Sequence, residues 1–486
     1  MALLVSAGLL GGCGCGGGSS GSSGTPASTS VSGVAATGAA LAGAMVTLKD
    51  VNGQIRTAVT GLDGSYSVSA AGLTAPFLLK AVGLDNTTVY SAALASDVGG
   101  RINITPLSSL VVGNAAGESP ATLFAGYGAA DAVELTANLG TAVEHAVMML
   151  DPVFDALGVE PSTAGLLRGS FAADHSGLDR VLDAITVTIA GDVATITDKA
   201  GTPIATDDLT SHDTVIATVG AASEASLFEY ADAAAGIAQL LADITAHCGT
   251  PAVSSTVLCL AHFDSINLLH ESHTSAIDLT DGIWLDIQEI DTRDYNLINR
   301  TGDDSISYSN PVIVGKSDIG YKARFTLLAS DGTNSGIFFL ESWFFQDAAD
   351  GNKWKFKGDQ QTLWLDVHHN SLQNYFDITA KAYDAWPTGI AYLIVTGPGL
   401  PEGGLKLDQS VFEDSFNNFR TYKCMKLTGD ASSSCGGTDV FTGGALLGSN
   451  QQYTFTAYDS SDAELPAHSG TYWLYLRDEP EAPDPT

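Results

Sequence analysis

The sequence is short of basic residues and has no long apolar run. Its 486 residues include 21 Lys and Arg against 55 Asp and Glu, a formal net charge of −34. A surface of that sign repels nucleic acid and anionic lipid head groups, so we expect neither as a partner of the folded part. No segment approaches the roughly 20 consecutive apolar residues of a membrane-spanning helix. Any membrane attachment would therefore have to come from a covalent lipid.

Catalytic and cofactor motifs are also missing from the part expected to fold. It contains no Gly-x-Ser-x-Gly elbow, no His-Glu-x-x-His motif, no Cys-x-x-Cys-His motif and no phosphate-binding glycine loop. Acidic pairs such as Asp207-Asp208 and Asp303-Asp304 are sequence neighbours, whereas glycosidases hold two carboxylates across a cleft. We therefore expect these pairs to be solvated, and we expect no catalytic residue, cofactor or metal site.

Histidine spacing gives one candidate for metal binding. His270 and His273 are three residues apart, and on a helix they could bind zinc with a third ligand such as His262. No third ligand is marked by its spacing, so the favoured interpretation is surface histidines. His368 and His369 are adjacent on an expected strand and point to opposite faces, which argues against shared ligation.

The N-terminus combines a short apolar run, a cysteine and a stretch of Gly and Ser. A run of about ten apolar residues is typical of an export signal. Leu10-Gly11-Gly12-Cys13 resembles the lipobox of bacterial lipoproteins. The resemblance implies a signal peptide over 1–12, a lipid on Cys13 and an outer-membrane anchor facing the periplasm or cell exterior. Residues 13–30 would then be a flexible tether.

Two alternatives stay open at this end. No Lys or Arg precedes the apolar run, so either the start lies upstream of Met1 or the signal is atypical. A plain secretory signal with chance cysteines is the other interpretation. Each of these still places the folded part outside the cytosol.

The remaining four cysteines form two pairs of equal spacing. Cys248 and Cys259 are eleven residues apart, and so are Cys424 and Cys435. An even set of cysteines in an exported chain predicts disulfides. Metal binding is the rival interpretation, but it favours Cys-x-x-Cys spacing or nearby histidines, and only His247 is adjacent.

Residues 31–110 show short alternating strands separated by Asn-Gly and Asp-Gly turns, which predict hairpins over 44–49, 54–60 and 65–69. This stretch resembles the carboxypeptidase-regulatory-like, transthyretin-type β-sandwich. The resemblance implies a spacer or adhesive module without catalytic residues. Turn chemistry accounts for its acidic and amide side chains better than calcium binding does; these are Asp50, Asn52, Asp63 and Asp85.

Residues 111–222 are expected to be a helical region with a β-ribbon. Apolar residues recur at helical spacing from 129 to 150, and Asp151-Pro152 is expected to end that helix. A short helix over 178–185 would lead into a ribbon of 186–189 and 193–197.

Residues 223–371 predict an α+β domain. A helix over 223–247 precedes aromatic strands that end in Trp354-Lys355-Phe356-Lys357-Gly358, a pattern that resembles the curved sheet of NTF2-like domains. Trp343, Trp354 and Trp364 could line a glycan- or peptide-binding face, although core packing is the default explanation. The strands expected here are 282–290, 321–329, 337–346, 353–358 and 362–367.

Residues 372–478 predict an immunoglobulin-like β-sandwich, and the acidic end over 479–486 is expected to be disordered. The whole is a multi-domain, mainly β protein with a helical middle region. The favoured function is a non-catalytic cell-surface lipoprotein in adhesion, scaffolding or ligand presentation, with a glycan or protein as a possible ligand. Two alternatives remain: a small-molecule- or glycan-binding protein with a pocket in the α+β domain, and an extracellular hydrolase.

Overall fold

A computed structural model gives the fold and confirms a mainly β chain with several antiparallel sheets and a few helices. The signal peptide, most of the tether, the expected strand 282–290 and nearly all of the acidic tail lie outside the described residues. The residues that the structure describes are 29–160, 165–211, 213–216, 221–248, 257–269, 305–330, 335–370, 375–383, 385–408, 411–413, 418–427, 439–446 and 449–479.

The first domain is a β-sandwich. One sheet pairs β1 (Ser30–Val34) with β4 (Ser65–Ser69), and the other has the order β3 (Ile55–Val59), β2 (Met45–Lys49), β5 (Phe77–Val82), β6 (Thr88–Ala93). The predicted strands are present, and β2 and β3 pair as the expected hairpin, whereas β4 pairs with β1 in the other sheet and not with β3. Their turns depend on Gly53 and Gly64, which both adopt positive φ, a conformation that glycine takes without a Cβ clash.

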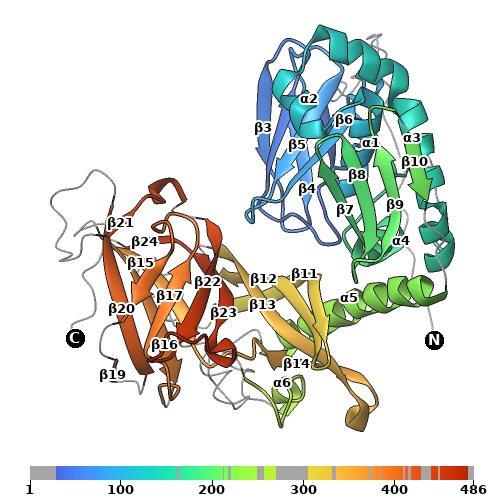
Figure 1. The fold of residues 1–486 in the computed structure, drawn as a ribbon. Coiled ribbons are helices and arrows are strands. Elements are labelled where there is room, and N and C mark those ends of the chain that lie inside the picture. The colour runs from blue at the N-terminus through green and yellow to red at the C-terminus, as the bar shows by residue number, and fades with distance from the viewer. Residues whose placement is uncertain are drawn as a thin grey trace, which may run out of the picture.

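A helical layer covers this sandwich (Figure 1) and packs on the outer face of one sheet, where Leu78 of β5 and Ala92 of β6 belong to the core of the helices. The interior of the sandwich is a separate core. The first helix, α1 (Pro106–Ala116), is capped by the side chain of Thr105 and packs on β6. Two more helices follow, α2 (Pro120–Gly126) and α3 (Ala129–Leu157), and a short helix η1 (Ala95–Asp97) precedes them. The region 111–222 is therefore not an independent domain.

The expected end of the long helix is wrong, because α3 continues through Pro152 to Leu157. Proline removes one backbone hydrogen bond from a helix interior. The extra turn nevertheless buries Val153, Phe154 and Leu157 in the core. Apolar burial of this kind offsets the lost hydrogen bond.

The predicted ribbon forms one edge of a four-stranded antiparallel sheet. Helix α4 (Gly177–Ala184) leads into β7 (Ile185–Ala190) and β8 (Val193–Asp198), and β9 (Pro203–Asp208) and β10 (Asp213–Ile216) extend the sheet.

Helix α5 (Ala221–Cys248) connects this upper half of the molecule to the lower half (Figure 1). Leu227 and Ala231 belong to the core of the first half, whereas Ile237, Leu241 and Ile244 belong to the next core. A helix of this length spans about 40 Å. One continuous helix therefore contributes to two hydrophobic cores.

The C-terminal half of α5 packs on a four-stranded antiparallel sheet. The sheet consists of β11 (Ser305–Ser317), β12 (Gly320–Ser330), β13 (Ser335–Asp347) and β14 (Lys353–Gly358), with the short helices α6 (Val257–Leu260) and η2 (Ala348–Asp350) beside it. Phe325 is 2% exposed and meets Phe344 and Phe356 edge to face. Aromatic side chains thus fill the space between helix and sheet.

The last domain is a second two-sheet sandwich, and it begins before the predicted boundary at 371. Trp364 lies on β15 (Trp364–Asn370), which pairs with β16 (Tyr375–Tyr383) and not with β14. One sheet adds β19 (Phe412–Glu413), β20 (Asn418–Leu427), β21 (Val440–Phe441) and β24 (Arg477–Glu479). The other contains β17 (Tyr392–Thr396), β18 (Leu405–Leu407), β22 (Asn450–Tyr458) and β23 (Gly470–Tyr475), with helices η3 (Gly444–Leu446) and η4 (Pro466–His468) nearby.

Candidate functional site

Arg324 lies where three domains meet. It stands on β12 between Ala323 and Phe325, whose side chains face α5, so alternation directs the guanidinium to the opposite face. There it forms an ion pair of 2.8 Å with Asp85, in the β5–β6 turn of the first sandwich. The Asp85 side chain is 2% exposed and that of Arg324 19% exposed. This pair joins the first sandwich to the α5 domain.

The same guanidinium contacts the last domain. It stacks over Trp473 of β23 at 5.3 Å from the ring centre and over Phe339 at 5.4 Å. The indole N–H of Trp473 donates to Glu341 at 2.8 Å, and Glu341 also pairs with Lys322. We call Asp85, Lys322, Arg324, Glu341 and Trp473 the junction cluster.

Asn450 attaches the last domain to the open half of β13. The strand β14 pairs only with residues 343–347 of β13 and leaves the first half of that strand without this neighbour. The side chain of Asn450 accepts from the Phe339 N–H at 3.1 Å and donates to the Ile337 carbonyl at 3.0 Å. One amide side chain thereby replaces part of a missing strand.

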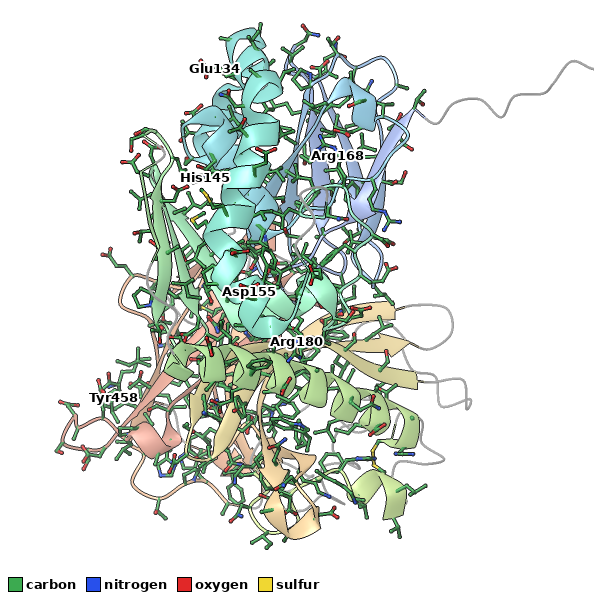
Figure 2. The ribbon with its side chains drawn as sticks, turned by 90° about the vertical axis from the view of Figure 1, so that its right-hand side faces the viewer. Glu134, His145, Asp155, Arg168, Arg180 and Tyr458 are labelled. Atoms are coloured by element: carbon green, nitrogen blue, oxygen red, sulfur yellow. A yellow bond between two sulfur atoms is a disulfide. The ribbon has the colours of Figure 1, made fainter. Side chains whose placement is uncertain are left out.

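The loop after α3 is tied to the first sandwich in a similar way. Arg168, labelled in Figure 2, makes a two-pronged contact with Asp97 at 2.7 and 3.0 Å. Backbone and side chain of Asn103 bond to the carbonyls of Leu167 and Gly169. The turn aspartates of this sandwich accept backbone N–H groups, as Asp50 does from Asn52 and Gln54.

The three tryptophans proposed as a ligand face do not share one. Trp354 packs against Gly236 of α5 and meets Tyr321 edge to face. Trp343 lies on the opposite side of the sheet, because its neighbour Phe344 is buried beneath α5. Trp364 belongs to the last sandwich. The three tryptophans therefore do not form one aromatic surface.

The first cysteine pair forms the predicted disulfide. Cys248, at the end of α5, bonds to Cys259 of α6 with 5.1 Å between the Cα atoms. Cys424 is disulfide-bonded as well. Cys435 and Cys13 lie outside the described residues, so the second pairing and the lipidation stay predictions.

Two expectations about polar side chains need correction. Asp207 is not solvated: it is 1% exposed and lies 3.1 Å from the Nε2 of His145, which Figure 2 labels on α3. His262 is not a lone surface residue either. Its Nε2 lies 2.7 Å from Nδ1 of His247, and the two rings stack. His270, His273, Asp303 and Asp304 lie outside the described residues.

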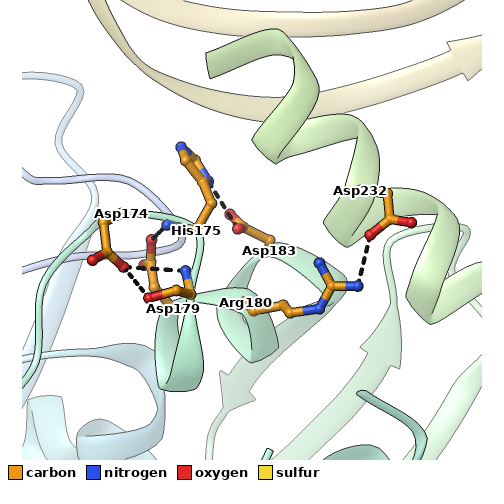
Figure 3. Close-up of polar contacts among 7 residues, drawn as sticks. Asp174, His175, Asp179, Arg180, Asp183 and Asp232 are labelled. Carbon is orange, nitrogen blue, oxygen red and sulfur yellow. Dashed lines mark hydrogen bonds and ion pairs between the residues drawn. The ribbon is translucent and has the colours of Figure 1, made fainter. Parts of the chain in front are cut away.

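A second polar cluster, which sequence reasoning missed, lies at the start of α4 (Figure 3). His175, Asp179 and Asp183 are four residues apart, so the two carboxylates share one face of the helix and the histidine precedes it. One ligand atom from each lies within 4.8 Å of the other two. We call these three residues the α4 cluster. The spacing His-x-x-x-Asp-x-x-x-Asp was the signal that could have revealed it.

The hydrogen bonds inside the α4 cluster leave one carboxylate oxygen of Asp179 without a partner. His175 Nδ1 lies 2.8 Å from Asp183 Oδ2, and the His175 backbone N–H donates to Asp179 Oδ2 at 2.8 Å. Asp179 is fully buried, and its Oδ1 has no hydrogen-bond partner. A buried carboxylate oxygen without a partner is unfavourable in a protein interior.

The electrostatics agree with that geometry. Burial, together with the Asp183 carboxylate, raises the pKa of Asp179 to about 7. Burial also raises the pKa of Asp183, although the bond to His175 opposes this shift. Arg180, on the same helix, is directed away and pairs with Asp232 of α5 at 2.6 Å (Figure 3). Among the described residues, Asp183 is bonded by the His175 ring, whereas the Asp179 side chain accepts only a backbone N–H.

Two further findings concern membrane-spanning helices and similarity to known proteins. Within the described ranges, no helix is long and apolar enough to cross a membrane. Comparison with protein-family models, curated proteins and solved structures finds no match for this chain. Function has to be inferred from the geometry above.

Proposed function

We propose that this chain is an exported, lipid-anchored cell-surface protein. It acts as a rigid scaffold for ligand presentation or adhesion. The lipid on Cys13 would hold it at the outer membrane, and residues 13–30 would separate the folded part from the bilayer. A protein or glycan ligand would then meet domains in a fixed arrangement.

The observation that carries this proposal is the junction cluster. A flexible array of modules needs only linkers, whereas here Arg324 contacts Asp85 of one sandwich and Trp473 of the other. The shared helix α5 adds a second connection between two cores. Inter-domain motion is the default unless the interface is large and hydrophobic, and α5 contributes apolar side chains to both cores. These contacts favour a scaffold of fixed shape.

Two further features support export. The Cys248–Cys259 disulfide is typical of an oxidising compartment. The net charge of −34 keeps such a chain soluble and away from anionic surfaces.

The finer domain assignments belong to the same proposal. The turn sequence Thr60–Tyr66, which carries the chain from one sheet to the other, supports a carboxypeptidase-regulatory-like first domain. The two packed sheets around Phe376 and Phe455 support an immunoglobulin-like last domain. The α5 helix on a four-stranded sheet supports an NTF2-like arrangement. Its aromatic filling, with Phe325 at the centre, favours a structural domain over a ligand pocket.

Protease release from cells tests the proposal. Intact cells, or spheroplasts if the anchor faces the periplasm, are treated with a low dose of a nonspecific protease. We expect cleavage in the Gly/Ser tether to release material that elutes from gel filtration as one particle of nearly full mass. Release of separate sandwich-sized particles would contradict a rigid scaffold, and protection of the chain in spheroplasts would contradict export.

A further inference from the structure

The α4 cluster has the composition and burial of an ion-binding site. It offers one imidazole and two carboxylates. Asp179 is fully buried, and Asp183 is only 4% exposed. The unpartnered Oδ1 of Asp179 is an acceptor that no protein group satisfies among the described residues. We propose that His175, Asp179 and Asp183 bind a divalent transition-metal ion, with Zn²⁺ as the preferred ion.

The local charge favours a cation. The exposed carboxylate of Asp174 acts electrostatically on both His175 and Asp179 and adds negative charge beside the two buried carboxylates. Lys199 and Arg180 both act electrostatically on Asp183, and Arg180 also pairs with Asp232. Buried carboxylates in proteins are paired or coordinate a metal ion. A bound divalent ion would provide a partner for the Oδ1 of Asp179 and add positive charge between the two buried carboxylates.

The ligand types select among ions. Ca²⁺ and Mg²⁺ prefer oxygen ligands alone, whereas a mixed set of imidazole and carboxylate suits Zn²⁺ and neighbouring first-row ions. Three protein ligands leave a further position for water, as in many zinc sites.

The position of the cluster indicates what the ion would do. The loop at Gly38 lies against α4 so closely that a Cβ there would come within 3.1 Å of both Asp183 Oδ1 and the Leu182 carbonyl. Helix α4 in turn packs on α5. An ion held by α4 would therefore stabilise the contact between the first sandwich and the connecting helix. This inference is independent of export and of the lipid anchor.

Zinc titration of the full chain, after removal of metal with EDTA, tests the site. We expect one Zn²⁺ ion per chain by calorimetry and a higher melting temperature with ZnCl₂ present. Even changes outside the ligand shell weaken metal binding ~10–100-fold, so His175→Gln and Asp179→Asn should each weaken it by at least that factor. Absence of zinc binding, or binding that survives both substitutions, would overturn the proposal.

Matched variants separate this site from other histidines and from misfolding. His262→Gln removes half of the stacked pair, and His145→Gln removes a histidine beside the single carboxylate of Asp207; both should leave the zinc affinity unchanged. Metal-free Asp179→Asn should be at least as stable as wild type, because it deletes a buried charge with an unpartnered oxygen. A folded Asp179→Asn protein that keeps its zinc, or zinc binding lost in His262→Gln, would each refute the assignment.

Discussion

The Arg324→Met substitution is expected to lower the free energy of unfolding by about 3 kcal/mol. The two halves of the molecule should then unfold separately. Removing one partner of a buried ion pair is destabilising by about 3–5 kcal/mol, because the other charge stays buried. The low end applies here, since Asp85 keeps hydrogen bonds from the backbone and hydroxyl of Thr87. Loss of the stacking on Trp473 adds to the effect.

Scanning calorimetry of the full chain measures whether the two halves of the molecule unfold together. The wild type should show one coupled transition, and Arg324→Met should show two, with the first at lower temperature. Arg56→Met is the matched control, because Arg56 is exposed on β3 and, among the described residues, bonds only to the Ile55 carbonyl next to it. The Asp85→Asn, Arg324→Met double variant should lose less free energy of unfolding than the two single variants lose together. Identical melting curves for wild type and Arg324→Met would show that the junction does not couple the domains.

A Cys13→Ala variant is expected to leave the membrane completely. Each buried acyl methylene contributes about 0.8 kcal/mol to membrane binding, and no described helix could replace that attachment. The net charge of −34 opposes residual binding to anionic lipid. The variant should therefore move from the membrane pellet to the soluble fraction and lose the label from a fatty-acid analogue.

Cys15→Ala is the control for this change. It removes a neighbouring cysteine but leaves Leu10-Gly11-Gly12-Cys13 intact, so both the label and the membrane association should be unchanged. Cys13→Ala protein that still sediments with washed membranes would refute the lipid anchor and leave the secretory alternative.

The local parts of the fold could be read from the sequence because their signals are local. Gly53 and Gly64 both adopt positive φ, and the Asn52-Gly53 turn joins β2 and β3 into the hairpin that the Asn-Gly pair predicts. The Asp63-Gly64 turn instead takes the chain to the other sheet, where β4 pairs with β1. The spacing of Cys248 and Cys259 likewise matched a disulfide. Alternation placed Trp343 and Phe344 on opposite faces of β13.

Long-range contacts could not be predicted in this way. Nothing near Arg324 in the sequence points to Asp85, which lies more than two hundred residues away in the chain. Pro152 has a strong local preference to end a helix, and burial of Phe154 and Leu157 overrode it. The assignment of Trp364 failed for the same reason, because strand pairing decided its domain.

The candidate site was missed for a different reason. The spacing of His175, Asp179 and Asp183 was visible, but a chain with 55 acidic residues contains many such patterns by chance. What distinguishes this one is burial: Asp179 and Asp183 are enclosed by the core, whereas most acidic side chains are solvated. Burial depends on packing that the local sequence does not reveal.

Small-angle X-ray scattering of the unlipidated Cys13→Ala full chain tests most directly whether the domains form one scaffold. We expect a profile that fits a single particle with the domain arrangement of Figure 1 plus a flexible N-terminal tether, and an expanded profile for the same chain carrying Arg324→Met. A profile of the Cys13→Ala chain that fits only a set of independently moving domains would contradict the account.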